Sequence, residues 1–248
     1  MAVGAVQHPL AGPAQEALVV AERDRVGRLA RVRELILVSQ DGLFLSLAVA
    51  TGLASANVAE TAVIVAGLAQ AIAGGLSEAT EARLAARAAA DLYDAEVAKE
   101  LAEIDVRARV EVDELSILLH EEGLTRVDAA AAAARIGTSP RSLAKTKVEK
   151  ELGLVHGERA GPRRDSLVGG LVYAAAALVP LWPYLVWGLP VALVVSLASA
   201  GVVVAALAFV KARVAHVSLA RNAAESALCA AAAAAGYLAG WLGEAWIR

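Results

Sequence analysis

The sequence predicts an all-α membrane protein with five transmembrane helices and an acidic three-helix domain inserted between the second and the third. Of its 248 residues, 58% are hydrophobic and the mean hydropathy is +0.57, whereas soluble domains are about 45–50% apolar. Most of the charged residues lie between Glu78 and Asp165, which leaves long uncharged stretches on either side. The apolar residues are mainly Ala, Val and Leu and show no sustained alternation with period two, so we expect helices and no strands.

Composition also excludes several classes of protein. The single cysteine, Cys229, allows no internal disulfide and no multi-cysteine zinc site. A net charge of −3 and a pI near 5.9 argue against a nucleic-acid partner, which would require a basic surface. The sequence contains no nucleophile–base set and no phosphate-binding loop, so we expect neither an enzyme nor a permanently bound cofactor.

Five stretches are long enough to cross the bilayer, since a spanning helix needs about 20 mainly apolar residues. They are residues 35–56, residues 58–77, two stretches within 166–210 that are divided at 187–190, and residues 226–243. Arginines precede the first span, and basic residues also lie between the fourth and the fifth. By the positive-inside rule the N-terminus and the acidic domain face the cytosol, and the C-terminus lies outside.

These spans divide the chain into four regions. We expect a cytosolic N-terminal segment at 1–33, two spans at 34–80, the acidic domain at 81–160 and three spans at 161–248. Residues 15–34 interleave apolar residues with arginines, which favours an amphipathic helix on the inner leaflet over a plain cytosolic lead-in. The first residues do not form a signal peptide, and this fits a bacterial plasma membrane.

The acidic domain is expected to contain three helices. Residues 78–122 lack proline and glycine, which predicts one long helix, or two with a kink, ending at Gly123. Residues 126–136 form the second helix. Ser139 can cap a third, with Pro140 at its first position, running to residue 152. Residues 157–162 are the expected linker into the third span.

Acidic side chains supply the candidate site. Residues 91–122 contain 11 acidic residues against three basic ones. Glu100 and Glu103 share one helix face, as do Glu111 and Glu114, because each pair is spaced i, i+3. Carboxylate oxygens presented in this way suit Mn²⁺ and Fe²⁺; the alternative is a solvated surface, which is commonly rich in glutamate.

Asp41 is the strongest candidate inside a span. A carboxylate there costs about 2.5–3.5 kcal/mol on insertion scales and is by default functional. It lies seven residues beyond Glu34, roughly 10 Å inside the cytosolic boundary. Glu78 ends the second span near the same boundary, so the two carboxylates could approach each other. The alternative is that Asp41 caps a helix at the interface.

Several motifs in order resemble the vacuolar iron transporter family, which exchanges cytosolic Fe²⁺ or Mn²⁺ for protons. They are Gln-Asp-Gly-Leu at 40–43, Ala-Gly-Gly-Leu-Ser at 73–77, Asp-Leu-Tyr-Asp-Ala-Glu at 91–96, Glu-Leu-Gly-Leu at 151–154 and Leu-Val-Pro-Leu-Trp-Pro-Tyr at 178–184. Their order and spacing hold over residues 31–241, nearly the whole chain.

The resemblance implies a homodimer with five helices per subunit and an ion pathway at the dimer interface. It implies that Asp41 takes metal and proton alternately, with Glu78 beside it in the pathway. The glutamates implied to gather metal are Glu100, Glu103, Glu111, Glu114 and Glu151, and Glu96 in the motif at 91–96 is a sixth candidate.

Two departures bear on the metal. Glu78 and Lys147 stand where the family usually has methionine. Exchanging a soft thioether for a carboxylate shifts preference toward harder cations such as Mn²⁺. A lysine among these glutamates is expected to weaken or reshape the metal site that they form. The sequence therefore predicts a divalent metal exporter coupled to protons; the alternative is a non-transporting membrane protein whose acidic helices sense metal or dock a partner.

Overall fold

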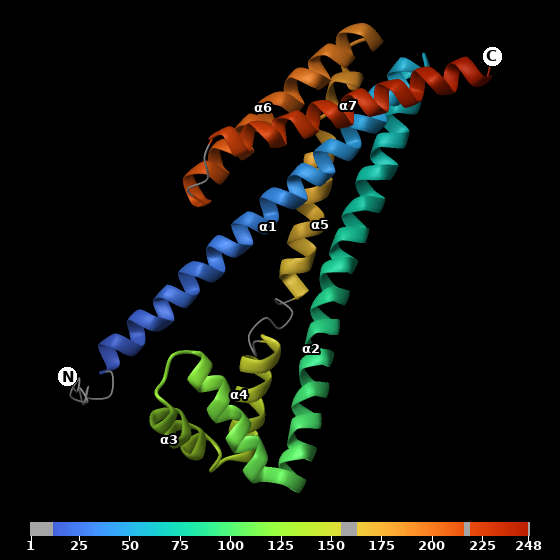
Figure 1. Ribbon diagram of the computed structural model, residues 1–248. Helices are drawn as coiled ribbons and strands as arrows, with labels where there is room; N and C mark the ends of the chain where they lie inside the picture. Colours follow the sequence, from blue (N-terminus) through green and yellow to red (C-terminus); the bar gives the residue numbers. More distant parts are fainter. Residues whose placement is uncertain (1–11, 155–162, 216–218, 248) are drawn as a thin grey trace. The chain divides into compact units, whose positions relative to one another are not determined.

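The computed structural model describes residues 12–154, 163–215 and 219–247, and every regular element in these ranges is helical (Figure 1). The expected all-α class is therefore confirmed, while the predicted linker at 157–162 lies outside the described residues. The helices are α1 (Pro13–Ser55), α2 (Glu60–Glu121), α3 (Arg126–Ile136), α4 (Pro140–Leu152), α5 (Arg163–Leu178), the 3₁₀ helix η1 (Trp182–Leu185), α6 (Leu189–Ala215) and α7 (Leu219–Ile247).

The chain divides into two compact units. We call Met1–Glu78 together with Val168–Arg248 the membrane unit, and Ala79–Leu167 the acidic unit. Among the described residues, three helical segments are long and apolar enough to cross a membrane: Gln15–Ser55, Glu60–Glu121 and Leu189–Arg213. The chain is thus a membrane protein. A shorter apolar helix covers Ser166–Leu178, and a total of five spans stays a prediction.

Helix α1 runs without a break through both its charged and its apolar parts. Its 43 residues at 1.5 Å each give a length of about 65 Å, roughly twice the thickness of the hydrocarbon core. The segment at 15–34, predicted to lie on the inner leaflet, is therefore the first half of the same helix. Its side chains are exposed, including Leu18, Val19 and Val26.

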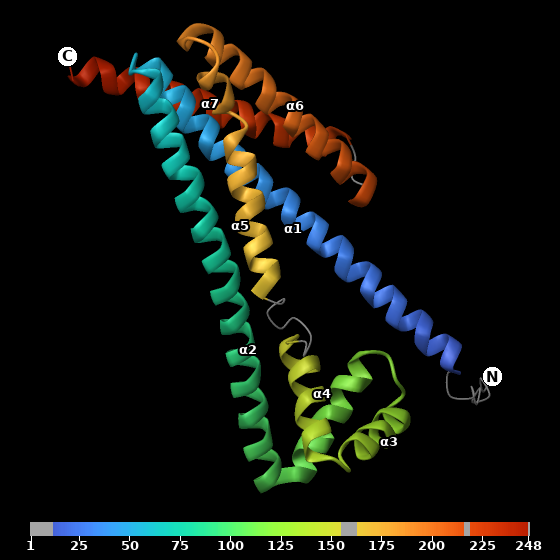
Figure 2. The ribbon, with the colours of Figure 1, turned by 180° about the vertical axis from the view of Figure 1, so that it is seen from behind.

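One buried cluster of the membrane unit joins three helices. Leu43 and Leu47 of α1 are buried against Ala200 and Val204 of α6 and Ala233 of α7. Both views of the ribbon show α6 and α7 lying against the C-terminal half of α1 (Figures 1 and 2).

Glycines allow α1 and α7 to cross closely. A Cβ atom added at Gly240 would overlap the carbonyl oxygen of Gly52. Next to this point Ser55 Oγ donates a hydrogen bond to Tyr237 O at 2.8 Å. Small residues and hydroxyl-to-carbonyl bonds are what helices use to associate in lipid, where no hydrophobic force drives them together.

Prolines end α5 earlier than the sequence suggests. The third and fourth spans are expected to divide at 187–190, but α5 stops at Leu178 and α6 begins at Leu189. Pro180 and Pro183 have no backbone N–H to donate, so they cannot continue the helix. Ser196 Oγ on α6 donates to Pro180 O at 2.7 Å and ties the turn to that helix. The expected division at 187–190 therefore agrees with the start of α6, whereas α5 ends earlier than expected.

The predicted helix boundaries of the acidic unit are confirmed. Helix α2 is interrupted at Arg107, whose φ of −139° and ψ of 39° are not helical, which is the expected kink. Gly123 follows the end of α2 with φ +106°. Ser139 caps α4 by accepting a hydrogen bond from Ser142 N at 3.3 Å, and Gly153 ends it in the left-handed region.

All three helices of the acidic unit contribute to its core. The buried apolar residues are Ile104, Leu115 and Leu119 of α2, Ala129 and Ala133 of α3, and Leu143 and Ala144 of α4. The small alanines of α3 let it approach its neighbours closely, and this core fixes which faces of α2 and α4 turn toward each other.

Candidate functional site

Asp41 lies on the exposed surface of α1 in a single chain. The residues on either side of it are not exposed: Gln40 is buried, and Gly42 packs against α5. A Cβ added at Gly42 would overlap the carbonyl oxygen of Tyr173. The sequence thus places α1 tightly against α5 at this turn while the carboxylate stays on the outer surface of the chain.

Tyr173 links the two acidic residues predicted for the pathway. Its buried hydroxyl accepts a hydrogen bond from Gln70 Nε2 at 2.8 Å. The hydroxyl also interacts electrostatically with the carboxylates of both Asp41 and Glu78. Gln70 Oε1 is buried and has no hydrogen-bond partner among the described residues. Asp41, Glu78 and the polar pair of Gln70 with Tyr173 all belong to the membrane unit.

Lys147 of α4 holds three of the six predicted ligands of the acidic unit. Its Nζ lies 3.0 Å from Glu100 Oε2 and 2.8 Å from Glu114 Oε2, and it donates a hydrogen bond to Glu111 Oε2. The side chains of Lys147, Glu111 and Glu100 are only 2%, 1% and 9% exposed, whereas that of Glu114 is 50% exposed. We call these four residues the lysine cluster.

Lys147 and Glu114 are held in their charged forms. Burial alone would lower the pKa of Lys147, but the hydrogen bonds to Glu111 and Glu114 and the negative charge of Glu100 outweigh it and raise that pKa above the usual value. The hydrogen bond from Lys147 in turn lowers the pKa of Glu114. At neutral pH an ammonium therefore faces carboxylate, and the buried charges are paired.

The other three predicted ligands have different neighbours. Glu103 pairs with Arg107 at 3.5 Å, and Glu96 with Lys99 at 3.7 Å. Glu151 is exposed at the end of α4. Within the part of the chain that the structure describes, no group of three or more His, Cys, Asp or Glu side chains is arranged to hold a metal ion. The carboxylates that do converge turn toward Lys147.

One functional contact could not be found by inspection of the sequence. Glu60 at the start of α2 accepts a hydrogen bond from Leu189 N at 3.1 Å, which satisfies the first turn of α6. No local signal links positions 129 residues apart. The burial of Lys147, in contrast, is indicated by the sequence pattern, because Lys147 lies between Leu143 and Val148 on the apolar face of α4.

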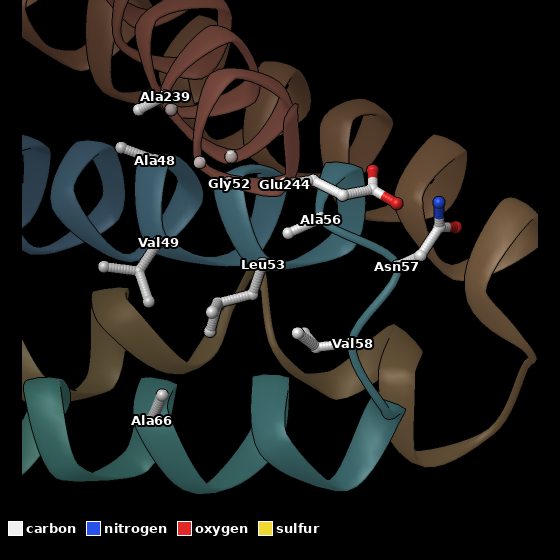
Figure 3. Close-up of a pocket in the computed structure, with 13 residues that line it drawn as sticks. Ala48, Val49, Gly52, Leu53, Ala56, Asn57, Val58, Ala66, Ala239 and Glu244 are labelled. Atoms are coloured by element: carbon white, nitrogen blue, oxygen red, sulfur yellow. The ribbon is translucent and has the colours of Figure 1, made fainter. Parts of the chain in front are cut away.

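A cavity of about 810 Å³ lies in the membrane unit, between α1, the start of α2 and α7 (Figure 3). Most of its lining is small and apolar, such as Ala48, Gly52 and Gly240, with Asn57 and Glu244 as polar side chains. None of the predicted site residues lines it, so it is separate from the pathway candidates.

Comparison with known proteins gives consistent matches. The sequence model of the VIT family matches residues 32–241. The chain is 34% identical to vacuolar iron transporter 2 of Oryza sativa subsp. japonica over 157 residues, which are 62% of this chain and 63% of that protein. It is 32% identical to vacuolar iron transporter 1 of the same species over 181 residues, 72% of this chain and 70% of that protein.

A third relative is the vacuolar iron transporter of Centaurea cyanus, which is 32% identical over 62% of this chain and 63% of its own length. The match to the first and third of these relatives therefore spans less than two thirds of their length.

Proposed function

This chain belongs to the VIT family, and we propose that it exports a divalent metal ion, Fe²⁺ or Mn²⁺, from the cytosol in exchange for protons. The relatives it matches are named as iron transporters, which favours transport over an enzymatic role. Three helical segments of spanning length and hydropathy support passage through a bilayer.

The position of Asp41 carries the proposal. It is a carboxylate within an apolar helix of spanning length, where an unpaired charge costs about 2.5–3.5 kcal/mol. A passing cation compensates that charge, and once the cation has left, a proton neutralises the carboxylate. Alternate binding of metal and proton at one group is what an exchange mechanism requires. Glu78, near the same hydroxyl of Tyr173, is the second pathway residue.

We propose a homodimer to account for the same exposure. Asp41 lies on the surface of the single chain, and a carboxylate facing lipid would be costly. A second copy that covers this face of α1 would enclose the two Asp41 side chains between the subunits and place the pathway at the interface.

The acidic unit is proposed to collect the ion on the cytosolic side. Its candidate ligands are Glu96, Glu100, Glu103, Glu111, Glu114 and Glu151. Because Glu78 replaces a soft ligand with a carboxylate, we expect Mn²⁺ to be carried at least as well as Fe²⁺. The proposed orientation keeps the N-terminus and this unit in the cytosol. The relatives are named for the vacuole, so they lend no support to the expected bacterial plasma membrane.

Proteoliposomes containing the purified protein test the proposal. Uptake of Mn²⁺ and of Fe²⁺ would be followed with a dye inside the vesicles, with and without a pH gradient. Asp41→Asn should abolish uptake. Glu34→Gln removes an exposed carboxylate two turns earlier on α1 and should leave uptake unchanged.

The outcomes separate the two functions considered. Uptake that depends on the gradient and is lost with Asp41→Asn supports exchange. Equal uptake by both variants contradicts the role of Asp41. Metal binding without any uptake would favour the alternative, a membrane protein whose acidic helices sense metal or dock a partner.

A further inference from the structure

The acidic unit already contains a cation at the point where its carboxylates converge. Lys147 is 98% buried, and its ammonium reaches Glu100, Glu111 and Glu114. The ammonium donates hydrogen bonds to Glu111 and Glu114, and Glu100 adds a third negative charge 3.0 Å away. This is the arrangement in which a buried lysine is best compensated.

The carboxylates in turn depend on that ammonium. Glu100 lies before the kink at Arg107 and Glu111 lies after it. Both carboxylates are buried and both meet Lys147 Nζ, so two negative charges lie close together. Arg107 offers Glu111 only a contact at 3.9 Å, and its own closer partner is Glu103. Glu100 Oε2 is buried and makes no hydrogen bond among the described residues, although Lys147 Nζ lies 3.0 Å from it.

We propose that Lys147 acts as an internal competitor of the divalent metal ion, so that Glu100, Glu111 and Glu114 bind metal only when the ammonium leaves them. The proposal deepens the function given above and rests on it in one respect, because the competing ion is the proposed cargo. It adds a residue that controls how strongly the acidic unit retains that cargo.

Geometry and charge make the two cations exclude each other. A Mn²⁺-sized ion needs carboxylate oxygens at roughly 2.0–2.2 Å on several sides. The ammonium lies 2.8 Å from Glu114 Oε2 and 3.0 Å from Glu100 Oε2 and fills the space between those oxygens. A divalent ion placed beside it would meet a like charge in a poorly solvated site. Capture at this cluster therefore requires Lys147 to move out, which weakens binding.

Titration of the purified full-length protein with Mn²⁺ tests the competition. Lys147→Met removes the ammonium and keeps the length of the side chain. We expect Mn²⁺ to bind this variant at least tenfold more tightly than the unaltered protein, as measured by the electron paramagnetic resonance signal of free Mn²⁺. Lys150→Met is the matched control. Lys150 lies on α4 like Lys147, but it is outside the lysine cluster and pairs with Glu122, which follows the end of α2.

A second variant guards against a failure of folding. Lys147→Gln removes the charge but keeps a hydrogen-bond donor for the carboxylates, and it should also bind Mn²⁺ at least tenfold more tightly. Affinities within threefold of the unaltered protein in both variants would overturn the proposal. A gain of equal size in Lys150→Met would overturn it too, since any lost lysine would then suffice.

Flux measurements keep this proposal distinct from the transport proposal. If the unaltered protein carries Mn²⁺ but Lys147→Met and Lys147→Gln show no gain in binding, the competition is wrong and transport stands. If Lys147→Met gains affinity but the unaltered protein shows no flux, the competition stands and transport fails.

Discussion

Replacing Lys147 with Met should open the acidic unit when no metal ion is present. The change leaves Glu100 and Glu111, each more than nine-tenths buried, without the ammonium between them. Breaking a buried ion pair by removing one partner costs about 3–5 kcal/mol, because the remaining charge stays desolvated. Since the pKa of Lys147 is raised above 10.5, its contribution is fully present at neutral pH and is lost only as the pH rises through that raised value.

Hydrogen exchange followed by mass spectrometry can measure this effect on the full-length protein in detergent with a chelator. Amides in α3 and α4 exchange through local opening, so a cost of about 3–5 kcal/mol should speed them by roughly 100- to 4,000-fold. Lys150→Met is the control. Its pair with Glu122 is between one third and one half exposed and is worth at most about 1 kcal/mol, which corresponds to no more than about fivefold.

Two results would refute this reasoning. Exchange in Lys147→Met within fivefold of the unaltered protein would mean that the carboxylates do not need the ammonium. Equal acceleration in α6 would mean that the whole protein is disturbed rather than the acidic unit. Combining Lys147→Met with Glu100→Gln and Glu111→Gln should recover part of the protection, because neutral groups are less costly to bury than unpaired charges.

Three further changes test the packing and capping of the helices. Gly240→Ala should lower the melting temperature of the detergent-solubilised protein, since the new methyl group overlaps Gly52 O and overpacking costs about 1–3 kcal/mol; Gly243→Ala, which meets nothing within 4 Å, should not lower it. Glu60→Ala leaves the first turn of α6 without its acceptor and should speed amide exchange there, while α3 stays unchanged. Ser139→Ala removes the cap of α4 and should cost about 1 kcal/mol, seen as roughly fivefold faster exchange in that helix alone.

Local rules predicted the acidic unit well because its helix ends depend on nearby residues. Ser139 with Pro140 begins α4 where the capping pattern places it, and Gly153 ends it. The kink at Arg107 falls inside a stretch without proline or glycine. The sequence therefore does not indicate where along this stretch the helix bends. The early end of α5 at Leu178 has a local cause in Pro180, which the count of uncharged residues overlooked.

Contacts between distant residues were predicted less well. The pairing of Glu60 with the start of α6 joins two helices far apart in the sequence, and no periodicity within either helix indicates it. The spacing of Glu111 and Glu114 predicted that both lie on one helix face, and both do meet Lys147 of α4. It could not show that the cation they meet is Lys147, because that depends on how α2 and α4 pack.

Lys147 and Asp41 show two ways in which one chain can keep charge in apolar surroundings. In the acidic unit the buried carboxylates and their counter-charge belong to the same fold, so the arrangement is complete without any ion. Asp41 has a buried amide and a packed glycine beside it, yet its own carboxylate lies on the surface of a spanning helix. A charge that the fold does not compensate permanently is free to be compensated in turn by a metal ion and by a proton. On this reasoning we propose that exchange takes place at Asp41 rather than at the lysine cluster, and that the lysine cluster controls how readily metal is retained before it reaches the membrane.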